Sequence, residues 1–420
     1  MKFCLRSSLI LSVALLAPVL LFPQTSLATL YREKQFFLLR DELAERTSEH
    51  SPSHTFYRGV IANRFNKLRE SNELIRAYLM TNDLSHQREA HETLADNYVR
   101  MYEYGKAADE YALLIEQFGK TVDRKQLDDY LNSEGMFGAL RSTQRQELKS
   151  DGELRLHGTR DAVGMLNLPV EINGRQEDFV FDTGAELSVV TESTAKKVGL
   201  KIIDMKYSVS TSTDISIESK LAVASAMKLG NAIVKNVVFL VLEDKALYFP
   251  PVKYQIKGIV GFPVMEAFGS VTISRDDEVT AGNRLSSNDS RSNMFLEGLK
   301  PVVEAEVFGK TMGFTFDTGG VTSTFYPKFL KANRTYIVRH SKLQRRKAGG
   351  AGGMKSVMAY MLKNLEMTIS GQTIKLRVAE IYPKPLNEES RIFYGNLGQD
   401  VIKQFATMTL DFQSMKLIFR

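Results

Sequence analysis

The chain has 420 residues, of which 43% are hydrophobic and 25% are charged. It is too long for one compact domain, and its composition is that of a folded chain rather than a disordered one. The formal net charge of +6 is too dilute over this length to indicate nucleic-acid binding, so we expect no nucleic-acid partner.

The first 28 residues have the pattern of a secretory signal peptide. Lys2 and Arg6 precede an apolar run, and the segment ends on Ser26-Leu27-Ala28, the small-x-small pattern of a cleavage site. We therefore predict cleavage after Ala28 and an exported protein, periplasmic or secreted. An uncleaved membrane anchor is the alternative, although the run is short for a spanning helix. No later segment is long and apolar enough to span, so we expect no stable membrane insertion after signal removal.

Side chains for metal or covalent chemistry are scarce. The only cysteine is Cys4, inside the predicted signal and ahead of its apolar run, so the mature chain would have no thiol and no disulfide. The histidines show no metal-ligand spacing, and no phosphate-binding or serine-nucleophile motif is present. We expect neither a metal nor a cofactor.

Residues 29–150 are predicted to form a helical domain. Gly and Pro are sparse there, and apolar residues recur at spacings of three and four. Leu94, Ala95, Tyr98, Ala107 and Tyr111 fall at the spacing of a tetratricopeptide helix pair, a resemblance that covers about 34 residues. No convincing copy lies one period away, so we expect a short tetratricopeptide-like bundle rather than an array. This domain is a candidate site for a protein partner.

From about residue 165 the chain changes to short β-rich runs broken by Gly and polar turns. We predict a linker at 151–164, a first lobe at 165–280, an interlobe linker at 281–298 and a second lobe at 299–420. Charge agrees with this division. Residues 29–150 hold 18 Lys and Arg against 20 Asp and Glu, so the positive charge of the chain belongs to the β-rich part.

The β-rich part contains an internal repeat. The stretch VEINGRQEDFVFDTGA at 170–185 aligns without a gap with AEVFGKTMGFTFDTGG at 305–320, an offset of 135 residues. Further on, GFPVMEAFGSVTI at 261–273 aligns with GQDVIKQFATMTL at 398–410, an offset of 137 residues. One Asp-Thr-Gly alone would be an ordinary turn. Two, at corresponding positions of a duplicated unit, indicate a site.

With these paired motifs the sequence resembles the pepsin-like and retroviral (retropepsin-like) aspartic peptidases, in a two-lobed single chain. In that family each lobe supplies one Asp-Thr-Gly loop, and an apolar-apolar-Gly segment crosses beneath it. The candidate crossing segments here are 259–261 and 396–398. The resemblance implies a multidomain protein: an all-α bundle followed by an all-β, two-lobed acid-protease domain of double-ψ-like barrels.

The resemblance also implies the site. The two loops would bring Asp182 and Asp317 together as the catalytic pair. The supporting loop residues would be Thr183, Gly184, Thr318 and Gly319, with the threonines bonding between the lobes and the glycines allowing a tight turn. Two carboxyl groups in contact cannot both ionise cheaply, so aspartic proteases share one proton between them and use it as acid and base. The sequence does not assign which aspartate carries that proton.

Two features fit the family less well. Gly320 stands where the first loop has Ala185, which we expect to loosen one carboxylate. The glycine-rich stretch at 345–357 is suited to a hairpin flap, whereas the matching stretch of the first copy, 207–220, is polar and lacks Gly. The basic cluster Lys342, Arg345, Arg346 and Lys347 is interpreted as a solvated loop base.

The leading hypothesis from sequence is therefore an exported aspartic endopeptidase acting on a polypeptide substrate. The alternative is a catalytically weak or inactive peptide-binding or scaffold protein that uses the same cleft. A third possibility makes residues 29–150 a removable prosegment. The substrate, the pH optimum and the oligomeric state cannot be predicted.

Overall fold

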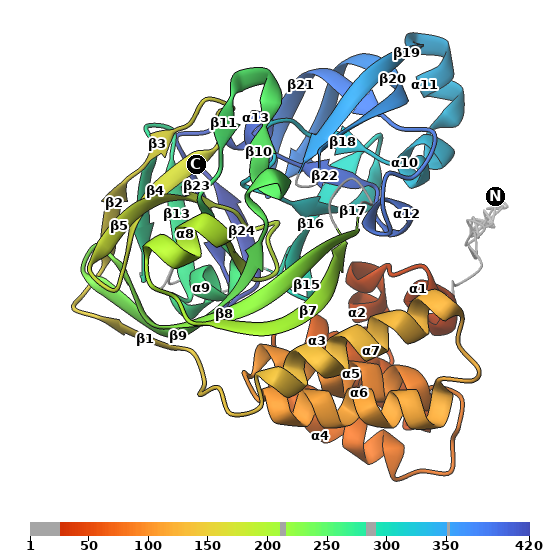
Figure 1. Ribbon diagram of the computed structural model, residues 1–420. Coiled ribbons are helices and arrows are strands. Elements are labelled where there is room, and N and C mark those ends of the chain that lie inside the picture. Colours follow the sequence, from red (N-terminus) through yellow and green to blue (C-terminus); the bar gives the residue numbers. More distant parts are fainter. Residues whose placement is uncertain (1–25, 211–215, 283–290, 351–352) are drawn as a thin grey trace, which may run out of the picture.

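The computed structural model describes residues 26–210, 216–282, 291–350 and 353–420 (Figure 1). The predicted signal peptide lies outside the described residues, except that Ser26 caps the first helix and Leu27 and Ala28 begin it. Its cleavage stays a prediction.

The N-terminal region is helical, as predicted, and begins earlier and ends earlier than the expected domain. Ser51 and Asp123 cap two of the helices by accepting hydrogen bonds from backbone amides of the first turn. Among the described residues no helix is both long and apolar enough to cross a membrane. The helices are α1 (Leu27–Arg32), α2 (Phe36–Glu45), α3 (Pro52–Arg64), α4 (Leu68–Leu79), α5 (Gln87–Arg100), α6 (Tyr104–Phe118) and α7 (Arg124–Ala139).

The predicted helix pair is present as α5 and α6. Ala95 and Ala107 are fully buried, as expected of small residues where two helices approach closely. The resemblance of this helix pair to a tetratricopeptide repeat stays a prediction. The last residues of the expected helical domain are not helical, because Glu147–Ser150 form strand β1, which pairs with β9 of the first lobe.

The first lobe is built on a nine-stranded sheet of order β1-β9-β6-β12-β5-β4-β8-β7, with β3 beside β4. Because β8 pairs with β9 as well as with β4, the ladder returns on itself. The strands are β1, β3 (Thr159–Arg160), β4 (Leu166–Ile172), β5 (Arg175–Phe181), β6 (Ser188–Thr191), β7 (Ile202–Ser210), β8 (Ser216–Leu229), β9 (Ala232–Leu242) and β12 (Gly258–Val260).

The second lobe repeats this order. Its strands run β15-β16-β17-β22-β18-β21-β20-β19, and β20 pairs with both β16 and β21. The internal repeat of the sequence is thus also a repeat of topology, although the double-ψ description stays a prediction. The strands are β15 (Met294–Glu297), β16 (Lys300–Val307), β17 (Lys310–Phe316), β18 (Thr324–Phe325), β19 (Ser341–Gly350), β20 (Gly353–Ile369), β21 (Gln372–Ile381) and β22 (Gly395–Leu397).

A five-stranded sheet of order β2-β14-β13-β23-β24 joins the lobes. In its middle, Thr272 pairs with Thr409, and their hydroxyl oxygens lie 2.7 Å apart. These two residues are equivalents in the repeat, so a pseudo-two-fold axis passes between them. The strands are β2 (Leu154–His157), β13 (Ser270–Ser274), β14 (Glu278–Ala281), β23 (Thr407–Asp411) and β24 (Lys416–Phe419), and β10 (Tyr248–Phe249) with β11 (Tyr254–Gln255) forms a separate small ladder.

Three expectations differ from the structure. The described β-rich part also contains six short α-helices and two 3₁₀ helices, which the all-β expectation did not include. The expected linker at 151–164 contains β2 and β3, and the expected interlobe linker at 281–298 ends in β15. Strand β2 was not recognised because its sheet partner β14 is distant in sequence, whereas β3 and β15 pair with the next strands, β4 and β16, and are too short to show a clear alternation. The α-helices are α8 (Glu192–Lys197), α9 (Phe262–Ala267), α10 (Pro327–Ala332), α11 (Arg334–His340), α12 (Glu389–Ile392) and α13 (Gln399–Ile402).

The helical region packs against the β-rich part around one aromatic side chain. Phe295 of β15 is 1% exposed, and its ring centroid lies 5.3 Å from that of Phe36 and 4.8 Å from that of Phe37. Beside it, Glu297 forms ion pairs with Lys34 and, at 3.2 Å, with Arg64. In Figure 1 the helices gather on one side of the molecule, below β7 and β15. The contact is built like a core, with aromatic rings and a paired charge.

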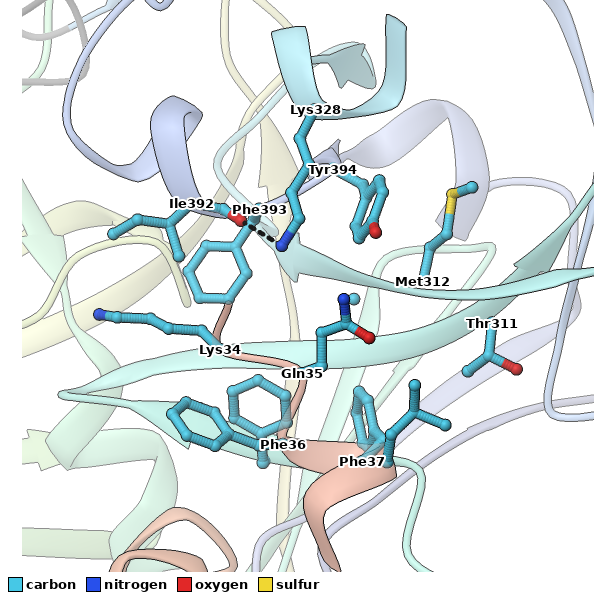
Figure 2. Close-up of a pocket in the computed structure, with 13 residues that line it drawn as sticks. Lys34, Gln35, Phe36, Phe37, Thr311, Met312, Lys328, Ile392, Phe393 and Tyr394 are labelled. Carbon is cyan, nitrogen blue, oxygen red and sulfur yellow. Dashed lines mark hydrogen bonds between the residues drawn. The ribbon is translucent and has the colours of Figure 1, made fainter. Parts of the chain in front are cut away.

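A small cavity of about 30 Å³ remains in this contact (Figure 2). Figure 2 shows Gln35 between the α1–α2 turn and Tyr394, and the Lys328 amine, which donates to the carbonyl oxygen of Ile392 at 3.2 Å. The space is large enough for one or two water molecules, and neither Asp182 nor Asp317 lines it. It is a packing defect between regions rather than a substrate pocket.

Candidate active site

Each candidate aspartate follows the last residue of a buried strand. Asp182 follows β5 and Asp317 follows β17. The crossing segments run parallel to these strands as β12 and β22, and the backbone amides of Asp182 and Asp317 donate to the carbonyl oxygens of Val260 and Leu397, at 3.1 and 2.9 Å. The structure therefore has the strand, loop and crossing segment expected from sequence in both lobes.

The two threonines hold the loops together. The backbone amide of Thr183 donates to the hydroxyl oxygen of Thr318, and that of Thr318 to the hydroxyl oxygen of Thr183, both at 3.0 Å. Each hydroxyl in turn donates across the lobes to the carbonyl oxygen of Phe316 or Phe181, at 2.8 and 2.9 Å. Both threonines are fully buried. Four reciprocal hydrogen bonds therefore fix the register of one loop against the other.

The two glycines allow the loops to approach. A Cβ atom at Gly184 would lie 2.8 Å from the carboxyl carbon of Asp317, and one at Gly319 would lie 2.4 Å from that of Asp182. Both distances are too short for any side chain, so each glycine makes room for the carboxyl group of the other lobe. The structure thus brings all six sequence-predicted site residues to one place.

The carboxyl groups of Asp182 and Asp317 lie together, since a Cβ atom at Gly184 would be 2.8 Å from the carboxyl carbon of Asp317 and 3.1 Å from Oδ1 of Asp182. Burial, followed by the charge and the hydrogen bonding of Asp317, raises the pKa of Asp182 well above its usual range. The Gly184 amide and the Lys300 ammonium oppose this rise only in part. The pair can therefore hold one proton at a pH where an exposed aspartate would have lost it.

The two carboxylates accept different numbers of hydrogen bonds from backbone amides. Asp182 accepts one, from Gly184 at 2.7 Å. Asp317 accepts two, from Gly319 and Gly320, both at 2.8 Å. The expectation that Gly320 loosens its carboxylate is therefore wrong, because the backbone of Gly320 turns its N–H onto Asp317.

Residues outside the motifs also reach the pair, and sequence reasoning missed their role. The amide nitrogen of Asn396 donates to Asp317 Oδ2 at 3.0 Å, and the Thr315 hydroxyl lies 2.9 Å from Asn396 Oδ1 and 2.8 Å from Glu389 Oε1. Lys300 donates to the other oxygen of Glu389 at 3.0 Å. The one available signal was the polar Asn396 in a segment that is otherwise apolar in this family.

Each lobe has a hairpin where the sequence predicted a flap. The glycine-rich stretch of the second lobe lies in the β19–β20 hairpin, whose ladder extends to Gly350 and Gly353, and residues 351–352 lie outside the described part. In the first lobe β7 and β8 form the matching hairpin, and residues 211–215 lie outside the described part. Asn132 of α7 pairs with both backbone groups of Ser208 in β7, which ties this hairpin to the helical region.

Comparison with known families agrees with this geometry. Residues 168–264 match the family model of aspartyl proteases. The match runs from β4 past the crossing segment of the first lobe, so it supports an aspartyl protease domain there. It ends before Asp317, and the likeness of the second lobe rests on the repeat and on the topology. A search of curated proteins finds no match to the chain.

In the parts of the chain that the structure describes, no group of three or more His, Cys, Asp and Glu side chains is arranged to hold a metal ion. The chemical groups that meet at the site are two carboxyl groups, backbone amides, one carboxamide and, behind them, an ion pair.

Proposed function

We propose that the protein is an exported aspartic endopeptidase that hydrolyses peptide bonds with a water molecule activated by Asp182 and Asp317. The observation that carries the proposal is the pair of Asp-Thr-Gly loops held face to face by reciprocal threonine hydrogen bonds, with the two carboxyl groups in contact. The aspartyl protease family match over the first lobe supports it.

The chemistry needs an acid and a base together, because a peptide carbonyl is a poor electrophile and water a poor nucleophile. The ionised carboxylate removes a proton from water while the protonated one donates to the carbonyl oxygen. The tetrahedral intermediate then collapses as a proton returns to the departing amine. The raised pKa of Asp182 provides the proton that this cycle requires.

Export is part of the proposal. It rests on the basic start, the apolar run and the small-x-small ending of residues 1–28. The substrate class is a polypeptide. A protein partner on the helical region is also proposed, on the basis of its tetratricopeptide-like helix pair.

The test is cleavage of a peptide library by the purified protein and by the Asp182→Asn and Asp317→Asn variants. We expect the wild type to cleave, statine-type peptides to inhibit, and both variants to lose all measurable turnover while still binding the inhibitor or a peptide. Wild-type cleavage by either variant would disprove the dyad. Tight peptide binding by the wild type without any product over a wide pH range would instead identify an inactive peptide-binding protein.

A further inference from the structure

A polar network in the second lobe occupies positions that are apolar in the first. It consists of Lys300, Thr315, Glu389 and Asn396. In the repeat, Lys300, Thr315 and Asn396 correspond to Met165, Val180 and Ile259. The strand registers agree, since Val180 pairs with Ile259 and Thr315 with Asn396.

In the first lobe these equivalent positions form part of a hydrophobic cluster. Met165, Val180 and Ile259 are 7%, 1% and 8% exposed and pack together. Nothing polar in this set reaches Asp182. Apolar side chains therefore lie behind Asp182, whereas a network of hydrogen-bonded polar side chains lies behind Asp317.

The second-lobe polar network is anchored by charge. Burial alone would lower the pKa of Lys300, but Glu389 and Glu186 outweigh it and raise the pKa, so this lysine stays charged. Lys300 lies 3.0 Å from Glu389 and 3.5 Å from Glu186. The ion pair fixes Glu389, whose Oε1 lies 2.8 Å from the Thr315 hydroxyl oxygen. That hydroxyl has one hydrogen, and its donation to Oδ1 of Asn396, at 2.9 Å, leaves the NH2 group of Asn396 to donate to Asp317.

The result is a difference in hydrogen bonding between the two carboxyl groups. Asp317 receives three N–H donors, from Gly319, Gly320 and Asn396, whereas Asp182 receives one backbone donor. Donors to a carboxylate favour its ionised form, because an ionised carboxylate has only acceptors to offer. The other charged or titratable groups that face the pair are Lys300, Glu186, Glu389 and Tyr326.

We infer that Asn396, held by Thr315 and the Glu389–Lys300 ion pair, is a positioning residue that keeps Asp317 ionised and leaves the shared proton on Asp182. Asp317 is then the base that takes a proton from water, and Asp182 is the acid that donates to the carbonyl oxygen. The acid and base roles of the two aspartates rest on the proposed function. The prediction that Asp182 carries the proton does not.

The first test measures protonation without any substrate. Carboxyl ¹³C NMR of the full chain, labelled at aspartate, follows the remaining carboxyl of each single variant. We expect Asp317, observed in Asp182→Asn, to ionise at lower pH than Asp182, observed in Asp317→Asn. Adding Asn396→Leu should move the Asp317 titration upward by about one pH unit and leave that of Asp182 in place.

Asn231→Leu is the matched control, because Asn231 is an exposed asparagine whose amide donates to two backbone oxygens of another segment. It should move neither titration. Equal titration of the two single variants, or equal effects of Asn396→Leu on both, overturns the assignment. A higher titration for Asp317 would mean that the carboxamide is turned the other way and that Asp317 carries the proton.

The second test uses turnover. Asn396→Leu should lower kcat about tenfold or more, leave KM within about twofold, and move the acid limb of the pH profile to higher pH. Thr315→Val, which introduces the valine found at this position of the first lobe, should lower kcat and move the acid limb in the same directions but by less. This variant provides the test if Asn396→Leu does not fold. Overlapping profiles would refute the inference. An asymmetric titration in a protein that cleaves no peptide would refute the proposed function alone.

Discussion

At the scale of single residues, the raised pKa of Asp182 links the site to the stability of the fold. A carboxyl group whose pKa is raised by folding costs stability as the pH rises from its unfolded value, about 3.9, to its folded value. The cost is complete above the folded value and absent at low pH. The fold therefore keeps the Asp182 carboxyl group in a buried position where its ionised form is destabilised.

Asp182→Asn should accordingly abolish cleavage and raise the melting temperature at neutral pH by a few degrees. The gain should shrink as the pH falls toward 3, because both proteins then carry an uncharged group at this position. Calorimetry across the pH range checks the result. Asp178→Asn, at an exposed position of β5, is the control and should alter neither property. A constant or negative shift would contradict the raised pKa.

The buried threonines give a second prediction. Thr183→Val keeps the volume but removes the donor to Phe316 and the acceptor for the Thr318 amide. Leaving such buried groups unpaired costs roughly 1–3 kcal/mol each, so the variant should lose several kcal/mol of unfolding free energy and most of its turnover. Thr311→Val, exposed at the start of β17, should lose almost none in the same denaturant titration.

At the scale of elements, the repeated strands could be predicted from sequence, and the reason is local. In each copy the strand before the Asp-Thr-Gly loop follows a tight hairpin turn, at Asn173-Gly174 and at Phe308-Gly309, where both residues have positive φ. The apolar run after each turn indicates a strand without reference to any distant residue. The candidate catalytic residues were found because their motif stands at a fixed distance from these turns.

What sequence could not supply are contacts that join distant elements. Asn396 reaches Asp317 across 79 residues, and Glu389 reaches Lys300 across 89. No local pattern marks them. The strand β15 was missed for a similar reason, since the aromatic rings that cover Phe295, those of Phe36, Phe37 and Phe393, lie far from it in the sequence.

The contact between α1–α3 and β15 yields a prediction for Glu297. Burial would raise the pKa of this carboxyl, but Arg64 and Lys34 outweigh it, and the pKa is lowered. Glu297→Gln should therefore cost about 2 kcal/mol at neutral pH and make the helical region easier to cleave with trypsin. The cost should vanish as the pH falls through the lowered pKa, where the wild type also loses the charge.

Glu388→Gln is the matched control. Its carboxylate pairs with Lys125 of α7 at 2.7 Å, but both side chains are mostly exposed. Exposed pairs contribute little, so we expect a change of about 0.5 kcal/mol or less and no change in trypsin cleavage. Equal effects of the two substitutions would mean that the Glu297 ion pairs do not hold the regions together.

At the scale of the whole molecule, the helical region resembles a permanent part more than a removable prosegment. Its aromatic contacts with Phe295, which in turn contacts Phe393, belong to the same continuous core as both lobes. Removing it would expose these rings to water. Its near balance of acidic and basic residues also differs from the basic character expected of prosegments in the aspartic peptidases that the sequence resembles.

If the proposed export takes place, we expect the mature protein to begin near Thr29, as measured by intact mass and N-terminal sequencing. Expression of residues 147–420 alone should give aggregated protein, because Phe295 and its neighbours lose their cover. A natural start near residue 165, or a stable and active truncated chain, would show that the helices are removed during maturation.

The pairing of Thr272 with Thr409 across the pseudo-two-fold axis has a consequence for how the two halves could diverge. An assembly of two identical chains must carry any substitution twice, so an asparagine beside one aspartate would also appear beside the other. Two halves joined in one chain are free of that constraint, so Ile259 can be apolar while its equivalent in the repeat, Asn396, is polar.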